Sequence, residues 1–271
     1  MPASRKHTTE NGLTLRQWVT LMEQLAPPAG AADWDNTGLL WAPTRPRRIR
    51  RLLLTIDCTP AVAAEALRRR MDAIVAYHPP LFSPLTRLDP QEPLHRRLLQ
   101  LIEARVAVYS PHTALDAAPD GVNDWLAKQV HGEQPATVHA LPDSVVRMVQ
   151  FKTTEPFNEL ASRVQARLKV PYLRLAMPAK RPRAVRHVAV CAGAGAGELA
   201  HVPADVWLTG EMKHHDLLAA QARGITVILA EHSHTERGYL PVLRRRLQNR
   251  TGPACSIQLA RHDRDPVTLY P

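Results

Sequence analysis

The chain has 271 residues, of which 45% are hydrophobic and 22% charged, so disorder is not expected and the chain is long enough to bury a core or to form two domains. Nowhere does an apolar run reach the roughly eighteen residues of a membrane helix, and the basic start lacks the apolar stretch of a signal peptide, so we expect a soluble, cytoplasmic protein without a membrane partner. Thirty-five Lys and Arg against twenty-five Asp and Glu give a net charge of +10, which favours anionic partners such as nucleotides.

Two kinds of segment alternate along the chain, β-branched apolar runs and segments with helical periodicity. This pattern predicts an α/β fold with mostly parallel strands and crossover helices. A Pro- and His-containing stretch over 133–143 indicates a loop after the first half. Before it we expect, in chain order, a helix over 13–25, a strand over 52–56, a helix over 61–69, a strand over 73–77, a helix over 93–104, a strand over 106–109 and a helix over 122–130.

The same rhythm resumes beyond residue 143, and the proline-rich stretch 171–183 indicates an exposed connection. We therefore expect two interlocking α/β halves, 1–132 and 133–271, with mixed, mostly parallel sheets and no long inserted domain. The expected elements of the second half are strands over 145–151, 187–191, 206–208, 225–230 and 256–259 and helices over 157–168, 214–222 and 237–248.

Cysteine and arginine usage narrows the class further. Cys58, Cys191 and Cys255 are odd in number, far apart and without a CxxC pair, which favours neither a disulfide framework nor a structural zinc knuckle. Arginine clusters lie at 45–51, 68–70 and 244–246 and form either a solvated surface or an anion-binding face. Nucleic acid is an unexpected partner, because only three Phe and five Tyr accompany them.

Three polar clusters follow three of the predicted strands: Tyr77-His78-Pro79-Pro80, His112-Thr113-Ala114-Leu115-Asp116 and His232-Ser233-His234-Thr235-Glu236. Ligands of open α/β sheets bind beyond the carboxyl ends of the strands, so side chains from distant segments can meet there. Imidazole together with carboxylate suits Zn, Fe and Mn, and a carboxylate can bridge two ions about 3.5 to 4 Å apart. The clusters therefore predict a metal site.

Each cluster also has a simpler interpretation. A single His after a strand is often a hydrogen-bonded loop residue, and an Asp near Gly is often a turn former. Thr235 could cap the next helix, with Glu236 in its first turn favoured by the helix dipole. The loop Ala192 to Gly197 is either a phosphate cradle or a place of close backbone packing.

Six motifs in order resemble the Nif3-like dinuclear metal centre family, whose members are also labelled GTP cyclohydrolase I type 2 homologues, and the resemblance covers nearly the whole chain. The segments that carry it are Asp33-Trp34-Asp35-Asn36-Thr37-Gly38-Leu39, Thr55-Ile56-Asp57, His78-Pro79-Pro80-Leu81-Phe82, His112-Thr113-Ala114-Leu115-Asp116, Thr209-Gly210-Glu211-Met212-Lys213-His214-His215 and His232-Ser233-His234-Thr235-Glu236-Arg237-Gly238. The resemblance implies a Nif3-like fold and a homohexamer.

The resemblance also implies a set of metal ligands for two divalent transition-metal ions, Zn, Fe or Mn. These are His78 and Asp116 in the first half and His232 and Glu236 in the second, with Glu236 bridging both ions. Many family members have a second histidine where this sequence has Tyr77. Because a phenol with a pKa near 10 is a poor ligand, the two ions are expected to bind with unequal affinity.

Three further residues stand beside the expected ligands and are candidate catalytic groups: His112, Glu211 and His214. Such groups orient metal ligands or relay protons, and the alternative is ordinary capping or surface polarity. The resemblance implies a metal-dependent hydrolase of the GTP cyclohydrolase I type 2 class, acting on a nucleotide or related anionic metabolite. The alternative is a non-catalytic protein that binds, delivers or responds to metal.

Overall fold

The computed structural model describes residues 12–180 and 182–268, which form two compact units. The first unit contains 12–28, Asp33–His112 and Leu240–Arg264, and the second contains Ala29–Ala32, Thr113–Tyr239 and 265–268. Among these residues, no helix is long and apolar enough to cross a membrane.

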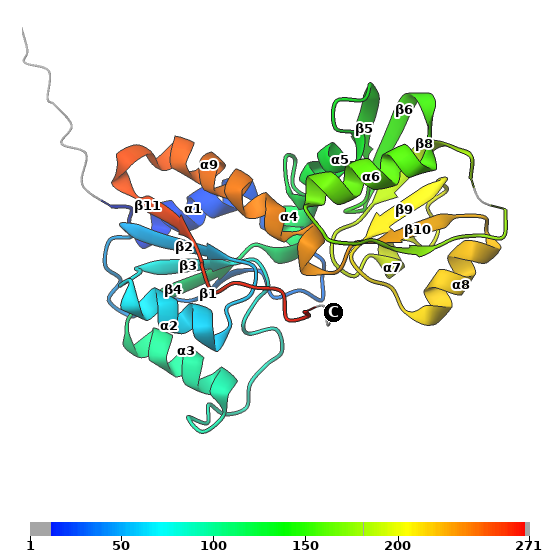
Figure 1. Cartoon of the computed structure of the whole chain (residues 1–271). Helices are drawn as coiled ribbons and strands as arrows, with labels where there is room; N and C mark the ends of the chain where they lie inside the picture. The colour runs from blue at the N-terminus through cyan, green and yellow to red at the C-terminus, as the bar shows by residue number, and fades with distance from the viewer. Residues whose placement is uncertain (1–11, 181, 269–271) are drawn as a thin grey trace, which may run out of the picture. The chain divides into compact units, whose positions relative to one another are not determined.

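The first unit is built on a five-stranded sheet in the order β1-β4-β3-β2-β11 (Figure 1). Four of its strands run parallel, and the edge strand β1 pairs antiparallel with β4. The elements are α1 (Leu15–Leu25), β1 (Gly38–Trp41), β2 (Arg51–Thr55), α2 (Pro60–Arg68), β3 (Ala73–Ala76), α3 (Pro93–Glu103), β4 (Ala107–Ser110), α9 (Leu240–Thr251) and β11 (Ser256–Leu259).

Helices cover both faces of this sheet (Figure 1). On one face Leu53, Ile74 and Val108 pack with residues of α2 and α3. On the other face the α1 residue Trp18 meets the Tyr109 ring edge-on, with 5.9 Å between ring centroids. Burial on both faces explains why the central strands read as continuous apolar runs instead of alternating ones.

The second unit contains a six-stranded mixed sheet in the order β5-β6-β8-β9-β10-β7. The neighbours β8, β9 and β10 run parallel, whereas β5, β6 and β7 join through antiparallel pairs. Its elements are α4 (His112–Ala117), which begins at the last residue of the first unit, α5 (Val122–His131), β5 (Ala136–Ala140), β6 (Arg147–Pro156), α6 (Phe157–Leu168), β7 (Arg174–Ala176), β8 (Ala184–Val190), α7 (Ala196–Leu199), β9 (Val206–Thr209), α8 (His214–Ala222) and β10 (Thr226–Leu229).

Side chains alternate between the two faces of this sheet, as the period of a strand requires. Val188 and Leu208 belong to the core that α5 and α6 cover. Their neighbours Ala189 and Trp207 belong to the core that α7 and α8 cover. Because β8, β9 and β10 run parallel, their carboxyl ends lie together, and the loops that contain Gly193, Glu211 and His232 follow them.

The prediction of a mixed α/β fold is confirmed, and several local predictions were wrong. The expected loop 133–143 contains β5, and the expected connection 171–183 contains β7. Both are edge strands whose side chains are mostly exposed. Because neither strand has a buried face, the sequence shows no alternation of apolar and polar residues there. Strand β1 and helix α4 were not foreseen, and α9 begins at Leu240 instead of residue 237, because 3-10 turns occupy the preceding residues.

Candidate metal centre

The first unit places a carboxylate beside the predicted ligand His78. Strands β2 and β3 are parallel neighbours with Thr55 opposite Ala76, so the residues that follow them emerge side by side. There the His78 Nδ1 lies 2.9 Å from Asp57 Oδ1. A carboxylate at Nδ1 fixes the ring and leaves Nε2 as the ligand nitrogen, the usual arrangement of metal-binding histidines.

His112 in the same unit is held in the same way. Its Nδ1 lies 2.7 Å from Asp35 Oδ1, and its backbone φ of 25° is in the left-handed region, a strained conformation that is common at functional sites. The buried ring of Tyr77 packs beside both imidazoles, with its centroid 4.9 Å from the His78 ring and 5.5 Å from the His112 ring, and the two imidazoles lie 5.3 Å apart. Both histidines are therefore rigidly placed.

In the second unit, His232 and Glu236 form an imidazole–carboxylate pair beyond the end of β10. The Nδ1 of His232 lies 2.9 Å from Glu211 Oε1, and its Nε2 lies 3.2 Å from Glu236 Oε1. Glu236 is 2% exposed. Glu211 follows the end of β9, the parallel neighbour of β10, which explains why residues twenty-one apart meet.

The loop after β8 passes directly over this pair. Gly193 has a φ of 65°, and a Cβ built on it would lie 2.7 Å from Glu236 Oε1 and 3.1 Å from His232 Nε2. The Gly193 amide donates a 2.9 Å hydrogen bond to the Thr235 hydroxyl, which donates to the His232 carbonyl at 2.7 Å. The space in front of the pair therefore exists only because residue 193 has no side chain.

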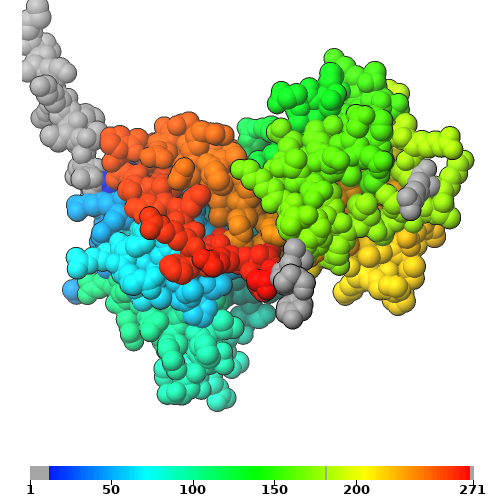
Figure 2. Space-filling view, viewed as in Figure 1, coloured from blue at the N-terminus to red at the C-terminus, as the bar shows by residue number. Residues whose placement is uncertain are grey.

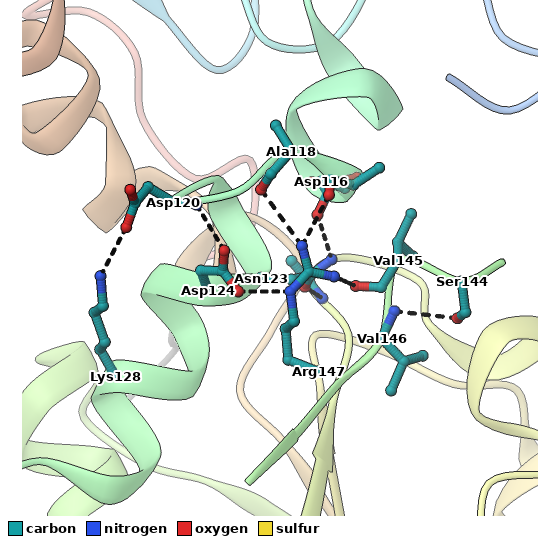
Figure 3. Close-up of polar contacts among 12 residues, drawn as sticks. Asp116, Ala118, Asp120, Asn123, Asp124, Lys128, Ser144, Val145, Val146 and Arg147 are labelled. Carbon is teal, nitrogen blue, oxygen red and sulfur yellow. Dashed lines mark hydrogen bonds and ion pairs between the residues drawn. The ribbon is translucent and has the colours of Figure 1, made fainter. Parts of the chain in front are cut away.

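Asp116 lies in the same unit, on α4, and is 9% exposed. The buried Asn123 links it to the glycine-rich loop: the Asn123 amide donates to the Asp116 carbonyl at 3.5 Å and accepts from the Ala192 amide at 2.8 Å (Figure 3). One side chain therefore joins the segment that carries Asp116 to the loop that covers His232.

Arg147 on β6 stabilises the end of α4. Its guanidinium is 3% exposed, donates to the carbonyl oxygens of Ala117 at 2.8 Å and Val145 at 3.0 Å, and pairs with the Asp124 carboxylate (Figure 3). The last carbonyls of a helix lack partners within the helix, so a buried cation there both satisfies them and complements the helix dipole.

Asp116 and Glu236 both act electrostatically on the buried Cys191 of the second unit. Burial raises the pKa of the Cys191 thiol well above its ordinary value, and nearby carboxylates, Asp116 and Glu236 among them, raise it further. Cys191 is therefore a neutral thiol in the metal-free protein. The predicted ligands of this unit, Asp116, His232 and Glu236, offer imidazole and carboxylate donors.

These residues fit a divalent transition metal. Imidazole and carboxylate are the donors that Zn, Fe and Mn accept, and the carboxylates on Nδ1 of His78 and of His232 leave Nε2 as the donor in each ring. Because Gly193 has no side chain, the space beside the Glu236 carboxylate and the His232 imidazole stays open, and a metal ion would bind there.

The candidate catalytic residues divide between the units. His112 belongs to the first, and Glu211 and His214 to the second. Glu211 orients His232, whereas His214 is an exposed residue at the start of α8 whose ring lies 5.4 Å from that of His215. Sequence reasoning missed Asp57 and Asp35 as histidine partners. For Asp57 a signal existed, since it follows the strand parallel to the one before His78.

Residues before His232 are held in a strained conformation, and this leads to a prediction. Glu231 has a φ of 64°, and its carboxylate accepts from Arg174 Nε at 2.8 Å and Nη2 at 3.3 Å. We expect Arg174→Gln to weaken metal affinity by about tenfold, the lower range for residues behind the ligands, because the turn that aims His232 loses its anchor. Competition with a chromophoric chelator measures this. Arg186→Gln, at an exposed arginine of β8, is the control; equal affinity in both variants would contradict the anchoring role.

The fold and these groups define a two-unit α/β protein with histidine–carboxylate pairs suited to metal binding. A family model described as Duf34/NIF3 (NGG1p interacting factor 3) matches residues 13–266, and the chain belongs to this family. Protein NIF3 homolog of Schizosaccharomyces pombe is 38% identical over 264 residues, covering 92% of this chain and 95% of the relative. Human NIF3-like protein 1 is 30% identical over 355 residues, covering 97% and 94%. The resemblance drawn from the motifs is confirmed.

Solved structures agree on the fold. A Staphylococcus aureus protein superposes with a TM-score of 0.82 at 18% identity, over 96% of this chain and 99% of that one. Reduced HcgD from Methanocaldococcus jannaschii superposes with a TM-score of 0.79 at 23% identity, over 92% and 98%. At these identities the likeness concerns the fold alone.

Proposed function

We propose that this protein is a metal-dependent hydrolase whose two divalent transition-metal ions are held by His78, Asp116, His232 and Glu236. The observation that carries the proposal is that His78 and His232, on different units, each have a carboxylate on Nδ1. This is the arrangement that prepares an imidazole for a metal. In this proposal, His78, His232 and Glu236 would offer two nitrogen donors and one oxygen donor to an ion.

The two ions have different donor sets in this proposal. One would be held by His78, His232 and Glu236, and the other by Asp116 and Glu236. A carboxylate that bridges two ions about 3.5 to 4 Å apart is common in two-metal hydrolases. Because Tyr77 stands where many family members have a histidine, the second ion binds more weakly.

Bound divalent ions lower the pKa of water and polarise the bond under attack. The chain's own groups supply orientation and proton transfer. The Glu211 carboxylate at Nδ1 of His232 favours the tautomer in which Nε2 is unprotonated and can bind a metal, and Asp57 does the same for His78. His112, held at Nδ1 by Asp35, is the first candidate for a proton donor to a leaving group, through its Nε2, and His214 is the second.

The substrate class follows from charge. A net charge of +10 favours an anionic metabolite such as a nucleotide, and the GTP cyclohydrolase I type 2 class is the reaction type that the motifs suggest. We also propose a homohexamer, in line with the same resemblance, and a cytoplasmic location, which three scattered cysteines without a CxxC pair favour. Size measurement by light scattering tests the assembly independently of the chemistry.

The proposal predicts metal-dependent turnover. Protein purified without added metal or chelator is expected to contain transition metal, and a metal-loaded sample to hydrolyse at least one member of a nucleotide panel. His112→Gln keeps a polar side chain but no titrating imidazole, so it should retain metal while losing rate by about 100-fold or more. Elemental analysis and product chromatography measure both.

Two outcomes would contradict this proposal in different ways. Metal bound at both positions without turnover of any substrate in the panel would favour a non-catalytic metal-binding protein. Turnover that survives complete removal of metal would exclude the two-metal mechanism altogether.

A further inference from the structure

A cavity in the first unit lies on the loop that carries His78. Its volume is about 480 Å³, within the range of small-molecule sites, which are mostly apolar with a few polar groups. Asn36 and Ser83 supply polar atoms to its lining. The apolar side chains that line it include Trp41, Phe82, Leu85, Leu88, Leu98 and Ile102.

Two exposed aromatic rings lie together, and one of them, Phe82, lines this cavity. Trp34 is 66% exposed and Phe82 is 54% exposed, and their ring centroids lie 6.1 Å apart at an angle of 50°. The His112 ring completes the group, 6.1 Å from Trp34 and 6.3 Å from Phe82. Leu85, Leu88 and Ile102 are also more than two-fifths exposed. Exposed apolar side chains that form a contiguous patch mark a binding surface.

Phe82 is tied to His78 through a stiff segment. Pro79 and Pro80 stand between His78 and the Leu81–Phe82 pair, and proline fixes the backbone φ. Arg97 donates to the Pro80 carbonyl at 3.3 Å, and the Asn36 amide donates to the Leu81 carbonyl. A molecule seated against Phe82 is therefore held at a fixed place relative to the His78 imidazole.

We propose that Trp34, Phe82 and this cavity bind a planar heteroaromatic ring of the substrate. The inference rests on the proposed function, since it places that ring on the loop of a metal ligand. Tilted ring pairs offer open π faces, and every nucleobase-like ring stacks on such faces. A peptide helix would need an extended groove, and a second protein copy would need about 800 Å² of surface on each partner, whereas a cavity of about 480 Å³ fits one small ring system. In the space-filling view, the surface formed by α3 and the segment before it is the lower edge of the first unit (Figure 2).

The test measures binding without turnover, in full-length protein treated with chelator. Adenosine, guanosine and cytidine monophosphates are titrated by calorimetry, with ribose 5-phosphate as the ring-free probe. We expect at least one nucleotide to bind at least tenfold more tightly than the ring-free probe. Trp34→Leu and Phe82→Leu keep apolar area but remove the π face, and each should lower nucleotide affinity by about tenfold. The control is Leu94→Ala, an exposed leucine outside the cavity lining.

Several results would overturn the inference. Equal binding of nucleotides and ribose 5-phosphate would show that the phosphate alone is recognised. Unchanged affinity in both leucine variants would remove the rings from the site. Self-association of the wild type that Trp34→Leu abolishes would make the patch an interface between copies. Because chelated protein is used, ring binding that persists while metal-dependent turnover fails would separate this inference from the proposed hydrolase.

Discussion

Glu236→Ala is expected to lose both metal ions, the largest single effect that the proposed centre predicts. Glu236 is buried, and its Oε1 lies 3.2 Å from His232 Nε2. If it bridges the ions, one substitution removes a donor from each. Loss of a residue behind a ligand costs about 10- to 100-fold in affinity, so loss of a bridging ligand should exceed about 100-fold for both equivalents. Elemental analysis after gel filtration measures the content.

Two companion variants make this result specific. Glu236→Gln keeps the volume of the side chain and removes its charge, so it separates loss of the ligand from loss of packing. Tyr77→Phe removes only the phenol oxygen and should leave the ion of His78 and His232 in place. Wild-type metal content in Glu236→Gln and Glu236→Ala would remove Glu236 from the set of ligands.

The sequence could predict the elements that carry the site because each has a local signal. Strand β10 is a short apolar run, and the polar cluster with His232 and Glu236 follows it directly. The carboxyl ends of parallel strands meet at one edge, and in the second unit this places Glu211 against His232. The same logic, applied to β2 and β3, would have identified Asp57 as the partner of His78.

Other features depend on contacts between distant segments, which leave no local pattern. The C-terminal strand β11 pairs with β2, with Ser256 opposite Arg51, and so α9 and β11 belong to the first unit although they follow the second in sequence. Asn123 is a polar residue, and nothing in the local sequence pattern predicts its burial. It is nevertheless fully buried and joins Asp116 to Ala192. A buried amide on a helix can be recognised only when its two partners are known.

The loop Ala192 to Gly197 had two interpretations, and the geometry favours close packing over a phosphate cradle. A Cβ on Gly195 would lie 2.6 Å from the Cys191 Cβ and 2.7 Å from the Thr209 hydroxyl. At Gly193 the obstacle would be the Glu236 carboxylate itself. Gly193 therefore allows the chain to approach the candidate ligands, and Gly195 allows it to pack against Cys191 and Thr209.

This geometry leads to the last prediction, that Gly193→Ala abolishes metal binding while the protein stays folded. The new methyl group would lie 2.7 Å from Glu236 Oε1 and 3.1 Å from His232 Nε2, so it would occupy the space that an ion needs beside both donors. A side chain at a φ of 65° also costs about 1 kcal/mol of stability.

Gly224→Ala controls for that cost, because Gly224 has a φ of 78° with nothing within 4 Å of its Cβ position. Gly197→Ala, also in open space, controls for the loop. Chemical denaturation and metal titration should show similar stability in Gly193→Ala and Gly224→Ala but metal binding only in the latter. Tight metal binding by Gly193→Ala would mean that the ions lie elsewhere.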